Sequence, residues 1–358
     1  MTERTIIVGA GVIGAALAYR LSLAGIRVTV IDAEAPAFAA SGRSFGWINA
    51  SFYLDHDHFA LRQAAMEAFH ALATDLGPTG AAWCGAINWE EVGEAQEATA
   101  TALEDLGYPL RRIGRAAFRR LEPAVADAPE EALLFPSEGA VDLADLTRRL
   151  LAGAGQHGAR FCFGLPVQEI RLAGGRVSGV ATPDGVLQAE RVVIAAGTGA
   201  PALIAPLGLQ LPMLRRPALI LRTAPVAPLI GHILASPGQE LRQEPDGRIL
   251  APTSAGHQSD DASEIGGSPE RLAEAAVDRL RAMLPGVDLR LEQVMRAFRP
   301  VPGDGFPVAG QTAVDGLWLA IMHSGATLAP LMGALLAREI VAGDASPLLR
   351  SYRPARFA

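Results

Sequence analysis

Three glycines near the start of the chain, Gly9, Gly11 and Gly14, have the spacing G-x-G-x-x-G. Gly9 allows a tight turn, Gly11 lets the backbone approach a pyrophosphate, and Gly14 lets a helix pack closely on a strand. Asp32, further along the chain, can accept hydrogen bonds from the hydroxyls of a ribose. These residue types predict a dinucleotide-binding site. The alternative is a glycine-rich turn in an ordinary α/β protein.

The elements around these residues complete the pattern. Residues 6–8 form a short apolar strand, residues 13–24 have helical spacing, and residues 27–32 form a second strand that ends at the acid. The amino terminus of the helix, with Val12 and Ile13, favours a bound anion. A strand, turn, helix, second strand and acid in this order are more specific than the glycines alone.

Composition limits what the protein can do. The chain has 358 residues, of which 50% are hydrophobic, which supports a large core and two domains. Its formal net charge of −7 and pI of about 5.6 argue against nucleic acid as a partner. The sequence contains no lysine, and all 31 basic residues are arginine, so no lysine is available as a base or for a Schiff base.

Cysteine usage and the ends of the chain bear on location. Cys84 and Cys162 are far apart without metal-ligand spacing, which predicts free thiols in a reducing cytoplasm and no metal site. The glycine motif begins so early that we expect no signal peptide. The apolar stretch 326–343 contains Pro330 and Arg338, so it predicts a buried helix and no transmembrane segment.

The rest of the chain alternates helical and strand patterns. Short strands separated by prolines and glycines in 211–260 predict an antiparallel sheet outside the nucleotide domain. The proline-rich passage 119–142 is expected to connect two regions, and 303–310 to form a loop. Residues 83–91 predict a strand, and helices are expected at 54–75, 92–106, 268–284 and in the last apolar stretch.

The order of these features resembles the FAD-dependent D-amino acid oxidase family, which includes glycine oxidase, sarcosine oxidase and D-amino acid dehydrogenase. The resemblance covers nearly the whole chain. It is carried by "IIVGAGVIGAALAYRLSLAGIRVTVID", "LEPAV", "EGAVDLADLTRRLLAGAGQHGA", "VVIAAGTGA", "FRPVPGDGFPVAG" and "HSGATLAPLMGALLAREI".

The resemblance implies an α/β (α+β) fold with a Rossmann-like FAD-binding domain assembled from discontinuous segments. A substrate domain built on an antiparallel sheet would be inserted into it. The expected FAD-binding domain comprises 1–80, 137–210 and 300–358, and the expected substrate domain comprises 81–136 and 211–299.

The same resemblance implies how FAD is held. The segment after Asp32 would pass the pyrophosphate and then run beside the flavin ring; its alternative is a surface loop with a buried tryptophan. Residues 320–328 contain no cysteine, so noncovalent FAD is expected. The first turn of the last helix would face the flavin and stabilise its reduced, anionic form. The residues implied are Ser41, Gly42, Arg43 and Ser44 for the phosphates, Gly46 and Trp47 for the ring, Val167 for the adenine, Ala195, Ala196 and Gly197 for close passage of the chain, and Gly325, Ala326, Thr327 and Leu328 in the helix turn.

The substrate residues are also implied by the resemblance. Arg299 matches an arginine that binds the substrate carboxylate, with a domain-bridging ion pair as its alternative. His323 and Asn49 would line the substrate pocket, although His323 is equally explained as a core or helix-entry histidine. Tyr53 is a further candidate that also reads as a packing residue. His56 and His58 are expected on a solvent-facing surface.

The implied activity is oxidation of a C–N bond in an amino acid or secondary amine. Hydride would pass to flavin N5, and the imine product would hydrolyse. The electron acceptor could be oxygen, a quinone or a protein, and homo- or hetero-oligomers are open. Two alternatives remain: the flavin subunit of a hetero-oligomeric opine- or hydroxyproline-type dehydrogenase, and an NAD-dependent dehydrogenase or non-redox nucleotide-binding module.

Overall fold

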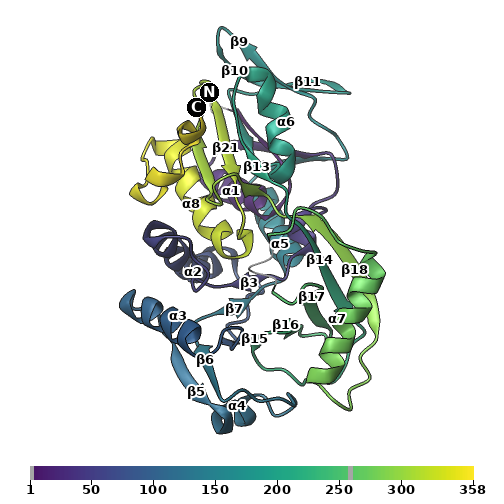
Figure 1. Cartoon of the computed structure of the whole chain (residues 1–358). Coiled ribbons are helices and arrows are strands. Elements are labelled where there is room, and N and C mark those ends of the chain that lie inside the picture. The colour runs from purple at the N-terminus through teal and green to yellow at the C-terminus, as the bar shows by residue number, and fades with distance from the viewer. Residues whose placement is uncertain (1–3, 257–260) are drawn as a thin grey trace.

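A computed structural model describes residues 4–256 and 261–358. The chain forms two sheet-based parts, one above the other in Figure 1. The upper part contains a mainly parallel sheet with helices packed on it, and the lower part contains a larger mixed sheet. This is the mixed α/β architecture expected from the sequence.

The upper sheet has six strands. All neighbouring pairs are parallel except the edge pair β20–β21, which is antiparallel. In sheet order the strands are β20 (Val308–Gln311), β21 (Leu317–Ile321), β12 (Arg191–Ile194), β1 (Arg4–Val8), β2 (Arg27–Asp32) and β8 (Arg160–Phe163). Strand β20 begins inside the passage 303–310, so the expected loop there ends earlier than its sequence suggested.

The turn between β1 and helix α1 (Val12–Leu23) needs glycine for two separate reasons. Gly9 has a φ of +117°, and a Cβ there would lie 2.4 Å from the carbonyl oxygen of Ala195. A Cβ on Gly14 would lie 2.0 Å from the carbonyl oxygen of Gly9. Gly9 therefore permits the turn and the close approach of the chain at the end of β12. Gly14 permits close packing of the helix on the strand.

The lower sheet has eight strands drawn from two separate stretches of the chain. Its pairs are antiparallel except for β15 with β4, which are parallel. In sheet order the strands are β18 (Leu291–Phe298), β14 (Pro217–Thr223), β17 (Ile249–Pro252), β16 (Glu240–Gln243), β15 (Ile233–Ala235), β4 (Ala86–Asn88), β6 (Glu131–Phe135) and β5 (Arg111–Gly114).

Two expectations for this sheet need correction. The passage 119–142 is not only a connection, because it contains β6, whose apolar residues pair with β4 and β5 while prolines flank the strand. The strand expected at 83–91 is limited to Ala86–Asn88. The strands of the lower sheet all fall within 81–136 and 211–299, and the division into two domains at those boundaries stays a prediction.

Three smaller sheets complete the strands. Strands β9 (Glu169–Ala173), β10 (Arg176–Thr182) and β11 (Gly185–Gln188) form a meander at the top of Figure 1. Strand β3 (Trp47–Ile48) pairs with β7 (Gly139–Ala140), and β13 (Met213–Leu214) pairs with β19 (Val301–Pro302). The β3–β7 pair ties the segment after the glycine motif to the chain that follows β6.

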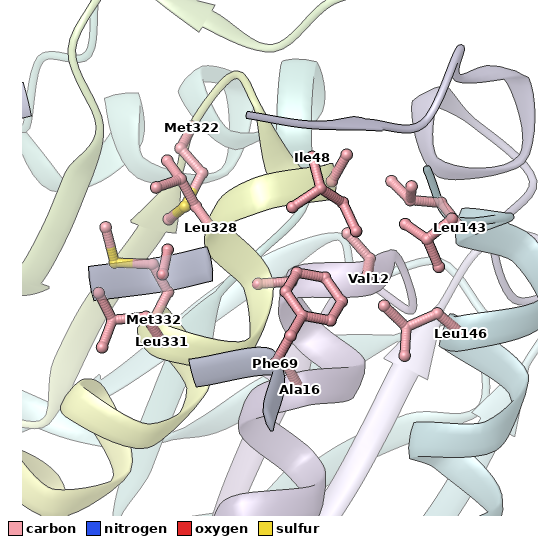
Figure 2. Packing of buried hydrophobic residues seen from close by; sticks show 14 of the residues in the cluster. Val12, Ala16, Ile48, Phe69, Leu143, Leu146, Met322, Leu328, Leu331 and Met332 are labelled. Atoms are coloured by element: carbon pink, nitrogen blue, oxygen red, sulfur yellow. The ribbon is translucent and has the colours of Figure 1, made fainter. Parts of the chain in front are cut away.

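Four helices pack together beside the upper sheet. Figure 2 shows Val12 and Ala16 of α1, Ile48 of β3 and Phe69 of α2 meeting in one buried cluster. Gly333 lets α8 approach α1, since a Cβ there would lie 2.8 Å from the backbone of Ala16. The helices are α1, α2 (His56–Leu76), α5 (Leu143–Gln156) and α8 (Gly325–Ala342), with α3 (Glu94–Asp105), α4 (Arg115–Leu121), α6 (Ala200–Ile204) and α7 (Pro269–Met283) elsewhere.

Among the residues described, α8 alone is long and apolar enough for a membrane span, and 67% of that stretch is buried inside the protein. It packs against α1 and α2. That position is the one expected for the core helix that the sequence predicted at 326–343.

Candidate active site

A cavity of about 540 Å³ is lined by residues from both sheets. Its lining comes from the β1–α1 turn, the segment after β2, the end of β12 and the start of α8. The paired strands β14 and β18 of the lower sheet complete it. The predicted site residues on its wall are Gly9, Gly11, Val12, Ile13, Asp32, Ser41, Arg43, Ser44, Gly46, Trp47, Asn49, Val167, Ala195, Ala196, Gly197, Arg299, His323, Gly325 and Ala326.

We call one group of the cavity-lining residues the glycine wall: Gly9, Gly11, Asp32, Ser41 and Ala195. Its contacts are between backbone and short polar side chains. Asp32 accepts hydrogen bonds from the amide of Ala10 at 2.6 Å and of Glu34 at 2.9 Å. Ser41 Oγ accepts from the amide of Val12 at 3.0 Å. The acid therefore holds the glycine turn in place as well as facing the cavity.

We call a second group of cavity-lining residues the arginine wall: Trp47, Asn49, Arg62, Arg299 and His323. Gly46 leads into it with a φ of +76°, and a Cβ there would lie 2.1 Å from the carbonyl oxygen of Val141. The close passage of these two backbones allows the Gly46 carbonyl to accept from the amide of Val141 at 2.9 Å. Trp47 follows at once in β3, with its ring buried.

A buried carboxylate, Glu138, holds the Trp47 ring in place through a hydrogen bond. Its Oε2 accepts from Trp47 Nε1 at 2.7 Å, and its Oε1 accepts from Ser51 Oγ at 2.6 Å and from the Tyr108 hydroxyl at 2.9 Å. Burial raises the pKa of Glu138 to about 7, although its three donors and the positive charge of Arg62 oppose that change. The tryptophan is thus held by a hydrogen-bond network and not only by packing.

Arg62 on α2 is buried and reaches the cavity wall. It donates to Ser324 Oγ at 2.8 Å and also to Asn49 Oδ1. Ser324 Oγ lies 3.2 Å from His323 Nδ1. Burial lowers the pKa of Arg62 to about 10, so the guanidinium stays charged at neutral pH. One side chain therefore joins α2 to the residue after β3 and to the residue before α8.

Arg299 follows β18 and lies half-buried on the cavity wall. Its amide donates to the carbonyl of Arg216 at 2.8 Å, which fixes the backbone beside β14. Ala218 and Ala297, small residues of the paired strands β14 and β18, line the same cavity. Arg43 bridges the two parts of the fold, since it donates to the carbonyl of Arg296 at 3.0 Å.

Known protein families identify the fold and its cofactor. A family model described as FAD dependent oxidoreductase matches residues 4–339. The chain belongs to this family. The cofactor is therefore FAD and not NAD, and the protein is a flavin-dependent oxidoreductase, as its motifs predicted. That the glycine wall holds this cofactor stays a prediction.

Individual relatives in this family are similar along most of the chain. A D-amino acid dehydrogenase of Rhizobium johnstonii is 27% identical over 391 residues, covering 89% of this chain and 91% of the relative. The bifunctional protein ThiO/ThiG of Trichormus variabilis is 28% identical over 390 residues, and the chain spans 55% of that relative's length. The crystal structure of glycine oxidase from Geobacillus kaustophilus superposes with a TM-score of 0.86 at 25% identity, covering 100% of both chains.

The geometry of the cavity fits the flavin cofactor of the family. At Gly9 and Gly11 the cavity is bounded by backbone alone. A Cβ on Gly11 would lie 3.1 Å from Ser41 Oγ, so a side chain there would crowd this serine. Val167 and Ala195 to Gly197 also line the cavity, where the sequence placed the adenine and the close passage of the chain. These residues would hold the nucleotide, and the arginine wall would meet the flavin ring.

Five predicted residues do not line the cavity. Gly14 and Gly42 are packing positions, since a Cβ on Gly42 would lie 2.2 Å from the carbonyl oxygen of Ala37. Thr327 and Leu328 are buried in α8, and the Thr327 hydroxyl bonds to the backbone of Asn49. The Tyr53 ring packs edge-on against the Phe59 ring, with 5.5 Å between the ring centroids, as expected if Tyr53 is a packing residue.

One expectation about the histidines of α2 is wrong. His58 was placed on a solvent-facing surface, but it is buried, and its Nδ1 accepts from the amide of Leu54 at 3.2 Å. Burial, together with the charge of Arg62, lowers its pKa to about 3, so it stays neutral. His56 is exposed as expected.

Sequence reasoning missed Arg62 and Glu138. The signal for Arg62 was present, because it shares the buried stripe of α2 with Phe59, Met66 and Phe69. A charge at an apolar stripe position marks a buried polar contact. Glu138 had no such signal, since its three donors come from distant parts of the sequence.

Proposed function

We propose that this flavoenzyme oxidises the C–N bond of an amino acid or N-alkyl amino acid at the arginine wall, with FAD bound noncovalently. The observation that carries the proposal is that Arg299 lines the same cavity as Trp47, Asn49 and the start of α8. A guanidinium fork binds a carboxylate in a bidentate way, which fixes the substrate at one end.

The chain's own residues would act mainly by positioning. Arg299 would hold the carboxylate. Trp47 and Asn49 would line the site, and their hydrogen bonds to Glu138 and Arg62, respectively, would keep them in place. The chemistry that FAD supplies when bound is acceptance of a hydride at N5. The amine would bind neutral, so that its lone pair assists loss of the hydride and no strong base is needed. The imine released would then hydrolyse in water.

Noncovalent attachment is supported by the positions of the two thiols. Cys84 and Cys162 are the cysteines of this chain, and neither lines the cavity. Acid or heat denaturation should release intact FAD into the supernatant. Flavin that remains with the denatured polypeptide would contradict this part of the proposal.

The test of the reaction is an anaerobic screen of D-, L- and N-methyl amino acids, watching the flavin absorbance at about 450 nm. Each acid is paired with the amine that lacks only its carboxylate. We expect bleaching by a subset of the acids and not by the matched amines. If no amino acid bleaches a flavin that dithionite does reduce, the proposed substrate class is wrong, while FAD binding stands.

A further inference from the structure

Arg62 is a buried positive charge whose hydrogen-bond acceptors are both neutral. The residue is 3% exposed, and its side chain donates to the amide oxygen of Asn49 and the hydroxyl of Ser324. Its Nε has no hydrogen-bond partner among the described residues. Glu138 acts on it electrostatically, but that carboxylate is itself taken up by Trp47, Ser51 and Tyr108. Burying such a charge is costly unless something compensates it.

Arg242 shows what compensation looks like elsewhere in the same molecule. It is also buried, and it donates to the carbonyl of Phe45 at 2.6 Å and pairs with Glu244 at 3.3 Å. Arg242 does not line the cavity, whereas Arg62 does. The arginine without a carboxylate partner is thus the one that faces the cofactor cavity.

The backbone beside Arg62 points to the same place. Ser324 has a φ of +57°, a left-handed conformation that is strained for a residue other than glycine and that collects at functional sites. It directly precedes α8, whose first residues Gly325 and Ala326 line the cavity. The first amides of a helix have no partner within the helix and favour negative charge. Arg62 therefore adds a full positive charge beside the amino terminus of α8, which already carries a partial positive charge.

We propose that Arg62 acts on the redox step through its charge: held by Asn49 and Ser324, its guanidinium stabilises the negative charge that the bound flavin gains on reduction. Reduction by a hydride adds two electrons and one proton, so a neutral ring becomes an anion. The inference rests on FAD binding and not on the identity of the substrate.

The test is the midpoint potential of the bound FAD at pH 7, measured with a chemical reductant so that no substrate is required. Arg62→Gln keeps hydrogen-bond donors but removes the charge, and we expect the reduced form to be favoured at least tenfold less. For a two-electron couple this is a drop of about 30 mV or more. Arg62→Lys keeps the charge and should lose less than half as much.

Arg242→Gln is the matched control, because it removes a buried arginine that has its own carboxylate. We expect it to lower the melting temperature and to move the potential less than Arg62→Gln does. A potential unchanged in Arg62→Gln, or moved no more than in Arg242→Gln, would overturn the proposal. A raised KM for a carboxylate substrate with an unchanged potential would also overturn it, because Arg62 would then bind substrate.

A second variant covers failure of Arg62→Gln to fold or to retain FAD. Asn49→Asp leaves Arg62 in place but sets a carboxylate against it, which pairs the buried charge. We expect this variant to fold and the potential to fall by a similar amount. Asn49→Asp that binds FAD with the wild-type potential contradicts a role for the net charge of Arg62.

Discussion

The glycine wall and the arginine wall of the cavity are built in different ways. On the glycine wall the residues come from the β1–α1 turn, the end of β2, the segment after β2 and the residue after β12, and the closest contacts are to main-chain atoms. On the arginine wall, Trp47, Arg62 and Arg299 come from β3, α2 and the end of β18, and Glu138 and Asn49 hold the first two. The first wall depends on missing side chains, and the second depends on which side chains meet.

This difference decides how each wall responds to change. A backbone cradle cannot relax around an added Cβ, because the atoms that it meets are themselves fixed by strand pairing. A side-chain network can lose one member and keep the rest, with a cost set by the groups left unsatisfied. We therefore expect all-or-none effects on the glycine wall and graded effects on the arginine wall.

The largest effect is expected for Gly9→Ala. Its Cβ would lie 2.4 Å from the carbonyl oxygen of Ala195, and its φ of +117° is unfavourable for alanine. The purified variant should contain no FAD and should melt well below the wild type, as measured by flavin content and thermal unfolding. Gly238→Ala is the control, since a Cβ there meets no atom within 4 Å. A yellow Gly9→Ala protein would show that the cradle relaxes after all.

A large but graded effect is expected for Arg299→Ala. A charged hydrogen bond contributes about 1.5–3 kcal/mol, or roughly 10- to 150-fold in binding. Substrate kcat/KM should fall by at least about tenfold while FAD stays bound, and Arg299→Lys should recover part of the loss. Amines without a carboxylate should not distinguish the variants. Loss of FAD or of folding in Arg299→Ala would instead favour the ion-pair alternative for this residue.

The two walls also differ in how far the sequence predicts them. Gly9, Gly11 and Asp32 are close in sequence, and their spacing alone implies the turn, the helix and the ligand. Arg62 was readable in principle, as a charge on an apolar helix stripe, but its partners Asn49 and Ser324 are brought to it only by tertiary packing. Strand β6 was missed because its flanking prolines resemble a linker.

A smaller effect, dependent on pH, is expected for Glu138→Gln. Burial raises the pKa of Glu138 to about 7 from an ordinary value of 4.5, so between these values the folded state keeps a proton that the unfolded state has lost. The contribution of Glu138 to the free energy of unfolding therefore falls as pH rises from about 4.5 to about 7.

Glutamine keeps the shape of the protonated acid and does not titrate. Glu138→Gln should match the wild type near pH 5 and become the more stable protein near pH 8, by on the order of 2–3 kcal/mol. Urea unfolding at the two pH values measures this. Arg62, Trp47, Ser51 and Tyr108 face the carboxyl, so the same pair of measurements on Arg62→Lys controls for the nearest charge. A difference that is the same at both pH values would place the folded pKa near its ordinary value.

The smallest effect is expected for Tyr53→Phe, and its contrast with Tyr108→Phe tests the boundary of the arginine wall. The Tyr53 ring packs on Phe59 and does not line the cavity, so removing its hydroxyl should change kcat/KM by less than about twofold and stability by less than about 1 kcal/mol. The Tyr108 hydroxyl donates to Glu138 at 2.9 Å and accepts from the amide of Ala50 at 3.2 Å, both in the buried layer behind Trp47. Its loss leaves the buried amide of Ala50 without this acceptor and removes one of the three donors to Glu138, at a cost of about 1–3 kcal/mol, without touching the cavity. A tenfold loss of kcat/KM in Tyr53→Phe at unchanged stability would favour the substrate-pocket alternative for Tyr53 and extend the arginine wall to the start of α2.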